Sequence, residues 1–170
     1  MDTLVSAVAQ FLPILVPVAA AAIWLTLPRR EKAGLAVQAV LAVVVVMALI
    51  QLAAGLHSDP RPFVVDPTVR PLFAHPADNG FPSDHTALAA TVALLVMLYR
   101  RKLGAVLLSA SLIAGAARVA AHVHHAQDII GALLIAVVAV AVVSAGWHWA
   151  EPRLPARIAR FAGRTPRLPA

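Results

Sequence analysis

Three short polar clusters interrupt a chain that is otherwise strongly apolar, and each cluster stands next to a long apolar segment. Ionisable side chains at membrane depth cost free energy, so residues of this kind in an apolar chain are candidates for function. The clusters are DPRPF with Arg61, FPSDH with Ser83, Asp84 and His85, and ARVAAHVHHAQD with Arg118, His122, His124, His125 and Asp128.

These residue types suit the binding and attack of a phosphate group. A pair of arginines binds a tetrahedral oxyanion through bidentate hydrogen bonds, and a helix that opens at Pro82 and Ser83 offers free N–H donors. His124 and Asp128 are four residues apart, which on a helix brings their Cβ atoms to about 5–6 Å. An aspartate that accepts from one imidazole nitrogen leaves the other as a nucleophile, and His85 would protonate the departing oxygen. The residues predict phosphoryl transfer through a phosphohistidine, without a metal.

Other interpretations of the same residues stay open. Arg61 and Arg118 would also serve as anchors that extend to the membrane interface, and His85 would also cap a helix. The three clustered histidines and Asp128 have a spacing that suits zinc, although neighbouring arginines would repel a cation.

The remaining polar residues near these clusters receive plainer interpretations. We expect the Asp84 carboxylate to point away from a phosphate while its N–H acts, since two anions repel. His122 and His125 are interpreted as supporting residues, and His75, Asp66 and Asp78 as ordinary loop polarity.

Composition indicates a membrane protein. Of the 170 residues, 61% are apolar and only 13% are charged, and the mean hydropathy is +0.82. Soluble domains are about half apolar and a quarter charged. We therefore predict an all-α polytopic membrane helix bundle of five spans, over residues 4–27, 33–56, 84–99, 103–122 and 128–149, with short helical turns in the 57–83 loop. The third span reaches only about 24 Å, so one of its ends should be recessed.

Lysine and arginine residues predict the orientation of the chain. In a five-span arrangement eleven cations fall on one side, which the positive-inside rule assigns to the cytoplasm. The amino terminus is then outside, the carboxyl terminus is inside, and the three polar clusters share the extracytoplasmic face. The eleven cations are Arg29, Arg30, Lys32, Arg100, Arg101, Lys102, Arg153, Arg157, Arg160, Arg164 and Arg167.

The same charges divide the chain into residues 1–150, a membrane-embedded domain, and 151–170, a basic cytoplasmic tail. The tail is expected to contact anionic lipid headgroups. Because the cations flank apolar segments, the excess of positive charge does not indicate a nucleic-acid partner. The chain has no cysteine, which excludes disulfides and thiolate metal sites.

The three clusters resemble the signature motifs of the type 2 phosphatidic acid phosphatase superfamily. The matching residues are Arg61-Pro62, the run from Pro82 to His85, and Arg118 followed by His124 and Asp128. Within that superfamily, DNGFPSDHT after RPF is most similar to bacterial undecaprenyl-diphosphate phosphatases of the bacitracin-resistance type.

The resemblance implies a role for each residue and a reaction without a cofactor. His124 would be the nucleophile, Asp128 its orienting partner and His85 the general acid. The phosphate would be bound by Arg61, Ser83, Arg118 and the backbone at Asp84. The expected reaction is hydrolysis of undecaprenyl diphosphate to undecaprenyl phosphate and phosphate at the plasma membrane. Alternatives are phosphatidic acid, phosphatidylglycerol phosphate or another prenyl-phosphate lipid as substrate, or a non-catalytic protein that binds lipid headgroups.

Two positions depart from the family pattern. Ala54 stands where the first motif usually has a lysine, and Ala117 replaces the serine that usually precedes the arginine of the third motif. The missing lysine removes one cation from the phosphate site. His57 and Arg70 are the residues that we consider as replacements.

Overall fold

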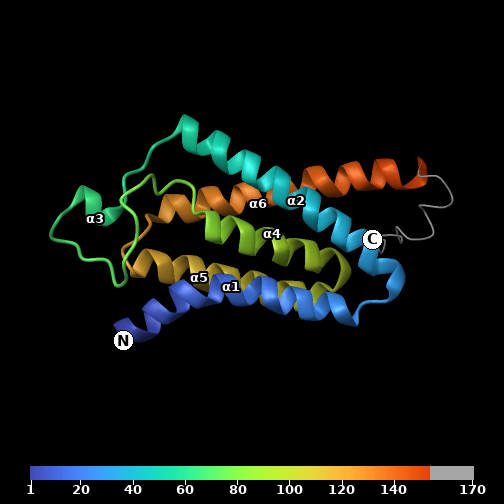
Figure 1. Cartoon of the computed structure of the whole chain (residues 1–170), viewed down its shortest axis with the longest axis horizontal. Helices are drawn as coiled ribbons and strands as arrows, with labels where there is room; N and C mark the ends of the chain where they lie inside the picture. Colours follow the sequence, from blue (N-terminus) through green and yellow to red (C-terminus); the bar gives the residue numbers. More distant parts are fainter. Residues whose placement is uncertain (154–170) are drawn as a thin grey trace.

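The computed structural model describes residues 1–153, and within that range every named element is helical. This confirms the predicted all-α bundle, and most helix ends lie within two residues of the predicted spans. The elements are α1 (Asp2–Thr26), α2 (Arg29–Leu56), α3 (Pro62–Val65), α4 (Asp84–Tyr99), α5 (Arg101–Ala120), α6 (Ala126–Ala150) and a 3₁₀ turn, Glu151–Arg153 (Figure 1).

Four of the helices, α1, α2, α5 and α6, are long and apolar enough to cross a membrane. Their outward side chains are large and apolar: Phe11, Val44, Ile113 and Leu134 are each more than half exposed. A soluble bundle would place polar residues there, whereas lipid accommodates apolar ones. The protein is therefore a multi-pass membrane protein. Pro13 and Pro17 lie inside α1, which continues past both of them.

Helix α4 lies in the middle of the bundle and packs against all four long helices. Small side chains permit this close packing, since Ala87, Ala90 and Ala93 are completely buried. With 16 residues, α4 is much shorter than its neighbours, so its first turn begins below the ends of the helices around it. A recessed helix start of this kind was predicted from the length of the apolar segment.

The two ends of the bundle differ in chemistry. One end gathers the amino terminus, the long loop between α2 and α4 with its helical turn α3, and the turn between α5 and α6; the α1–α2 and α4–α5 turns lie at the other end (Figure 1). An ion pair of 3.0 Å between Arg100 and Glu31 joins the two turns at that second end. From residue 154 on, the predicted basic tail 151–170 lies outside the described residues, and this part includes Arg157, Arg160, Arg164 and Arg167.

The long loop is closed at its base by Asn79. The Asn79 amide donates to the carbonyls of Ala54 and His57, and its side-chain oxygen accepts from the N–H groups of Asp59 and Phe81. These four hydrogen bonds tie the end of α2 to the segment that enters α4. The loop is thereby folded back over the recessed start of α4.

Candidate active site

A pocket of about 400 Å³ opens at the end of the bundle where the long loop folds over α4. Its wall combines apolar residues of α2 with polar residues of the loop and of the first turn of α4. The lining residues are Met47, Ile50, Gln51, Ala54, Arg61, His75, Pro76, Asp78, Asn79, Phe81, Pro82, Asp84 and His85. The pocket thus joins an apolar flank to a charged floor, as a lipid with a charged headgroup would require.

His124 lies beside this pocket, in the turn between α5 and α6. The turn is tight: α5 ends at Ala120, and His122 adopts a left-handed backbone conformation with φ of 59°. Few residues other than glycine adopt this conformation, which here reverses the chain and points His124 inward. The His124 side chain is only 1% exposed.

Two guanidinium groups converge on one nitrogen of His124. Arg61 Nη1 lies 3.3 Å and Arg118 Nη2 3.4 Å from His124 Nε2. Arginine donates hydrogen bonds and cannot accept them, so Nε2 must present its lone pair. The same geometry would place a bound oxyanion directly in front of that lone pair.

The other ring nitrogen of His124 faces Asp128. Asp128 Oδ2 lies 3.1 Å from His124 Nδ1 and also accepts from the backbone N–H of His125 at 2.9 Å. Asp128 is in the first turn of α6, where the helix dipole stabilises a carboxylate, and it is fully buried. The carboxylate therefore fixes the proton of His124 on Nδ1. This is the pairing that the four-residue spacing predicted.

The two arginines are held from several elements. Arg61 precedes α3; its Nε donates to Asp78 at 2.8 Å and its Nη1 donates to the Val123 carbonyl at 2.6 Å. Arg118, in the last turn of α5, donates from Nη1 to the Ala9 carbonyl in α1 at 3.2 Å. Neither arginine extends to the membrane interface, since they are 5% and 2% exposed. The interpretation of the two arginines as interfacial anchors is therefore wrong.

One edge of the Arg118 guanidinium is left for a ligand. Its Nε is buried and has no hydrogen-bond acceptor within the described part of the chain. Nε and Nη2 form one edge of the guanidinium, and Nη2 faces His124. Because a buried donor without a partner is costly, an oxyanion in front of His124 would stabilise this arrangement.

The first turn of α4 supplies the other side of the pocket. The Asp84 carboxylate turns toward its neighbour His85 and lies 2.7 Å from His85 Nδ1. His85 Nε2 is then the ring atom that remains for exchange of a proton with a ligand. The Asp84 side chain lines the pocket and does not point away as expected, but its hydrogen bonds are to His85.

Ser83 is near the site but does not line the pocket. Its hydroxyl lies 3.1 Å from the Thr86 hydroxyl, and its backbone N–H donates to the Asp128 carbonyl at 3.2 Å. Ser83 thus joins the start of α4 to the start of α6. Direct binding of a phosphate by its side chain stays a prediction.

Three loop residues belong to this region although the sequence did not single them out. His75 Nε2 lies 3.0 Å from Arg118 Nη2, and Asp78 bonds Arg61; both had been interpreted as loop polarity. Asp59 accepts from His125 Nδ1 at 2.9 Å and from Gln127 at 2.6 Å. No periodic spacing relates these loop positions to the helices, so the sequence carried no signal for them. By contrast, the Asp66 side chain accepts hydrogen bonds from the backbone N–H and the hydroxyl of Thr68, within the loop, and is ordinary loop polarity.

The zinc interpretation does not fit the arrangement of the histidines. His122 is exposed and lies 3.2 Å from the Arg70 carbonyl, away from His124. Asp59, His125 and Asp128 do bring their ligand atoms within 4.8 Å of one another. However, Asp59 Oδ2 and Asp128 Oδ2 already accept hydrogen bonds from His124, His125 and Gln127. These groups form a network that supports Asp128.

Neither residue considered as a replacement for the missing lysine lines the pocket. The His57 ring is exposed and packs edge-on against Phe81 at 4.8 Å. Arg70 is exposed. Ala54, at the position of the family lysine, does line the pocket. A cation at that position would therefore have entered this space.

The surroundings of His124 favour its neutral form. Burial is the main cause that lowers its pKa below the usual value, and the positive charges of Arg118 and Arg61 lower it further. The hydrogen bond to Asp128 acts in the opposite direction. A neutral imidazole keeps a lone pair on Nε2, which is the form required of a nucleophile.

Comparison with known proteins agrees with this geometry. Residues 33–152 match the PAP2 superfamily, and the chain belongs to that family. The matched range includes every residue that forms the pocket and the paired His124 and Asp128.

Two curated bacterial proteins are similar in sequence. The chain is 33% identical over 131 residues to the bacitracin transport permease protein BcrC of Bacillus licheniformis, over 77% of this chain and 62% of that protein. It is 36% identical over 83 residues to the undecaprenyl-diphosphatase BcrC of Bacillus subtilis (strain 168), over 49% of this chain and 42% of that protein. The matches thus span less than two thirds of the length of these relatives.

A solved structure shares the fold. The crystal structure of Aquifex aeolicus LpxE superposes with a TM-score of 0.68, at 23% sequence identity and over 85% of both chains. The helices of this chain are therefore arranged as in that solved structure.

Proposed function

We propose that this protein is an integral membrane phosphatase that hydrolyses a prenyl diphosphate lipid through a phosphohistidine intermediate. The observation that carries the proposal is the convergence of Arg61 and Arg118 on His124 Nε2, with Asp128 on the opposite ring nitrogen. An anion bound by both guanidinium groups would present its phosphorus to the nitrogen lone pair. Membership in the PAP2 superfamily supports the same class of reaction.

The reaction proceeds in two steps. His124 Nε2 attacks the terminal phosphorus in line, the bond to the bridging oxygen breaks, and His85 donates a proton to the departing lipid phosphate. Water then attacks the phosphohistidine with His85 as the base, which releases inorganic phosphate and restores the imidazole. Arg61 and Arg118 stabilise the charge that develops on the equatorial oxygens of the phosphoryl group. Electrostatic stabilisation of this kind supplies most of the reduction of the barrier in phosphoryl transfer.

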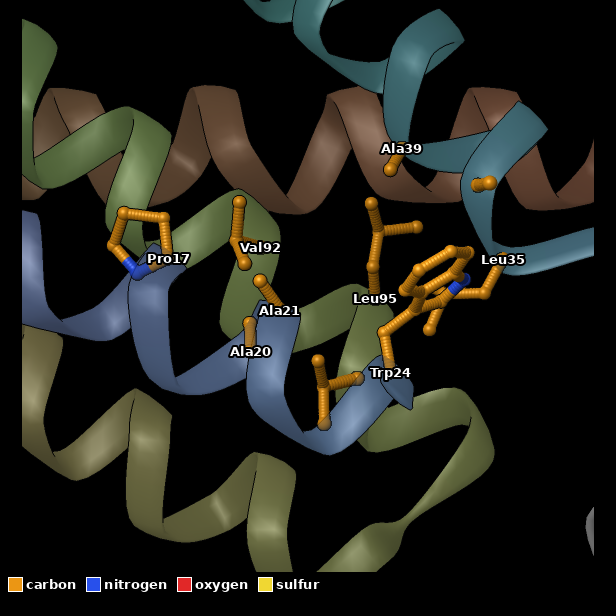
Figure 2. A pocket seen from close by; sticks show the side chains of 10 residues that line it. Pro17, Ala20, Ala21, Trp24, Leu35, Ala39, Val92 and Leu95 are labelled. Carbon is orange, nitrogen blue, oxygen red and sulfur yellow. The ribbon is translucent and has the colours of Figure 1, made fainter. Parts of the chain in front are cut away.

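The leading substrate is undecaprenyl diphosphate. The Bacillus subtilis relative is an undecaprenyl-diphosphatase by name, and a separate apolar pocket supports a long hydrocarbon chain. A second pocket, of about 350 Å³, lies between α1, α2 and α4 and is lined by apolar side chains such as Trp24, Ala39, Val92 and Leu95 (Figure 2).

The two pockets lie along the same helix faces. On α2, Ala39 of the apolar pocket and Ile50 of the charged pocket are three turns apart, about 16 Å, on one face. On α4, Val92 and His85 are two turns apart, about 10 Å, again on one face. A prenyl chain whose diphosphate occupies the charged pocket would follow these faces into the apolar pocket.

The end of the bundle that holds the site faces the extracytoplasmic side in this proposal. Support comes from the cations at the opposite end, among them Arg29, Lys32, Arg101 and Lys102, and from the positive-inside rule. The lipid diphosphate would then be cleaved in the outer leaflet.

Phosphate release by the purified full-length protein tests the proposal. The substrates are undecaprenyl diphosphate, undecaprenyl phosphate and phosphatidic acid, each measured with and without EDTA. We expect the diphosphate to be hydrolysed fastest, EDTA to have no effect, and His124→Ala to abolish release. Quenching the reaction with terminally labelled substrate should trap an acid-labile, alkali-stable phosphoryl group on wild-type protein and none on His124→Ala.

Other results would favour the alternatives. If phosphatidic acid is hydrolysed fastest, the substrate class is glycerophospholipids and not prenyl diphosphates. Loss of activity with EDTA and recovery with zinc would replace the metal-free mechanism. A wild-type protein that binds these lipids but releases no phosphate would be a headgroup-binding protein.

A further inference from the structure

His75 lies against the candidate phosphate-binding arginines although it comes from the long loop and not from a helix. Its Nε2 is 3.0 Å from Arg118 Nη2, and its ring meets the ring of His124 edge-on at 6.0 Å between centroids. The side chain is half-buried and lines the charged pocket. The residue is therefore placed to touch whatever anion sits in front of His124.

His75 is neutral in the hydrogen-bond arrangement of the structure. Because Arg118 can only donate, His75 Nε2 must accept, and its proton lies on Nδ1, which is 3.4 Å from the Pro76 carbonyl. Burial lowers the pKa of His75 first, and the charge of Arg61 lowers it further. His75 thus accepts one N–H of Arg118.

Charges at the site do not favour a multiply charged anion without a further cation. The two guanidinium groups of Arg61 and Arg118 face three carboxylates: Asp78 bonds Arg61, Asp84 lines the pocket, and Asp128 bonds His124. The arginine charge is therefore already offset. A phosphate dianion that entered this space would need additional positive charge to compensate its desolvation.

Two of the residues that line the pocket, His75 and His85, are histidines, whose side chains can carry a proton in a reaction. In the proposed reaction His85 must release its proton to the departing group, and His124 must stay neutral to attack. His75 is the residue that remains free to carry a charge throughout.

We propose that His75 is a phosphate-binding residue that takes up one proton as the anion enters. Arg118 Nη2 transfers its hydrogen bond from His75 to a phosphate oxygen, and His75 Nε2 binds a proton from solvent and donates it in a hydrogen bond to the same phosphate group. The inference rests on the proposed function, because it adds a residue to the same site. It also explains how the pocket tolerates Ala54 in place of a lysine.

Binding of an anion should therefore strengthen as the pH falls through the histidine range. The titratable and charged groups that face His75 set this range. Arg118, Arg61 and His124 oppose its protonation, whereas a bound anion and the carboxylates favour it. The charged and titratable groups that contact His75, act on its pKa or line the same pocket are, among the described residues, Arg61, Asp78, Asp84, His85, Arg118 and His124.

Sulfate binding to the purified full-length protein tests the inference. Sulfate is tetrahedral and stays a dianion from about pH 5 to 8, where histidines titrate. Its dissociation constant is obtained from the sulfate-dependent shift of thermal unfolding at each pH. We compare wild type with His75→Gln, whose amide oxygen still accepts from Arg118 but which cannot gain a proton, and with His75→Lys, which carries a charge but cannot accept.

At the acidic end we expect His75→Gln to bind sulfate about ten- to a hundredfold more weakly than wild type, as for a lost charge-assisted hydrogen bond. The difference should vanish at the alkaline end. His75→Lys should bind tightly at every pH, and Ala54→Lys should restore binding to His75→Gln, since residue 54 lines the same pocket. His57→Gln, outside the pocket, should follow wild type.

A different pattern would overturn the inference. If His75 only positions Arg118, His75→Gln will bind like wild type at every pH and His75→Lys will bind weakly. The outcome is separable from the proposed function, because sulfate binding needs no hydrolysis. A protein that shows the expected sulfate pattern but releases no phosphate from lipids retains the inference and loses the proposed activity.

Discussion

At the scale of single residues, the site is defined by which atoms can donate and which can accept. The arginines fix the lone pair of His124 on Nε2, and Asp128 fixes its proton on Nδ1. No other position of the imidazole proton satisfies all three contacts, since arginine has no hydrogen-bond acceptor. The tautomer that a nucleophile needs is thus imposed by the surroundings before any substrate binds.

The pH dependence of hydrolysis should report this arrangement. Because burial and the two arginines lower the pKa of His124, its imidazole stays neutral at a pH where a free histidine would be protonated. The acidic limb of the kcat/KM profile should therefore lie below about pH 6.5. Asp128→Asn removes an influence that raises this pKa, so the limb should move to still lower pH.

Asp128→Asn should also lower kcat by about two to four orders of magnitude, because an amide that donates would favour the wrong tautomer. The measurement is the pH profile of phosphate release for both proteins. If the acidic limb of Asp128→Asn stays at the wild-type pH or moves to higher pH, the limb reports the titration of a group other than His124.

Gly80 is a residue whose missing side chain matters to the same carboxylate. A Cβ at this position would lie 3.0 Å from Asp128 Oδ2 and 3.1 Å from the Asp59 carbonyl. The chain cannot easily retreat, since the Gly80 N–H donates to that carbonyl at 2.8 Å. We expect Gly80→Ala to displace Asp128 by a few tenths of an ångström and to lower kcat by about tenfold or more.

Gly55→Ala is the matched control, because a Cβ there meets nothing within 4 Å. It should leave kcat unchanged. Equal rates for wild type and Gly80→Ala would mean that the carboxylate position is not critical to turnover.

At the scale of helices, the short α4 decides where the site can form. Its first turn starts below the ends of its neighbours, so the long loop can fold over it and bring Arg61 beside His124. The close approach of α5 to the end of α4 depends on Gly104, where a Cβ would lie only 2.3 Å from Met97 Cα.

Gly104→Ala should destabilise the bundle. Alanine favours a helix over glycine by about 1 kcal/mol, but the overlap with the Met97 backbone can be relieved only by separating the two helices. Overpacking of this kind costs about 1–3 kcal/mol, and overlap with backbone atoms leaves little room for relaxation. The destabilisation by overlap should therefore exceed the gain in helix propensity. Thermal unfolding in detergent should show a lower midpoint for Gly104→Ala.

Gly146→Ala provides the comparison, because it lies in α6 with open space around its Cβ position. Its midpoint should be equal or higher. A midpoint for Gly104→Ala at or above that of wild type would show that α4 and α5 do not approach as closely as described.

The apolar pocket between α1, α2 and α4 yields a prediction about substrate length. Ala39→Phe would fill part of its volume of about 350 Å³ (Figure 2). If a prenyl chain lies there, KM should rise by about tenfold, the effect of one or two lost apolar contacts, for the undecaprenyl substrate and remain unchanged for a short-chain diphosphate.

Val40→Phe is the control, since Val40 is the next residue but is 66% exposed on the outer surface of α2. Both substrates should be hydrolysed normally by this variant. An equal rise of KM for the short and the long substrate in Ala39→Phe would place the chain elsewhere and attribute the change to a distorted helix.

At the scale of the whole molecule, the two ends of the bundle carry different charges, and this difference predicts the orientation. The chain has no cysteine, so single cysteines report their side of the membrane without background. Ser58→Cys, exposed in the loop near the site, should react with a membrane-impermeant maleimide in intact cells. Lys102→Cys, exposed at the opposite end, should react only after permeabilisation. The reverse pattern would place the site in the cytoplasm.

The sequence by itself determined the helices and the central pair of the site. Apolar runs of sufficient length must be helical in lipid because their backbone groups have no other partners, and this fixed the spans to within a few residues. His124 and Asp128 were predictable as a pair because they are four residues apart where α6 begins, with His124 in the preceding turn and Asp128 in the first turn of the helix. Two spans separate the loop before His85 from the turn after Arg118, and an even number of spans returns the chain to the same end, so Arg61, His85 and Arg118 were expected together.

Only the tertiary structure decided what surrounds that pair. His75, Asp78 and Asp59 belong to an irregular loop, whose path depends on the hydrogen bonds of Asn79 and on the recessed start of α4. A loop has no periodicity, so its side chains cannot be assigned to a face in advance. The physical reason is that helix contacts follow from local spacing, whereas the meeting of a loop with three helices follows from packing of the whole chain.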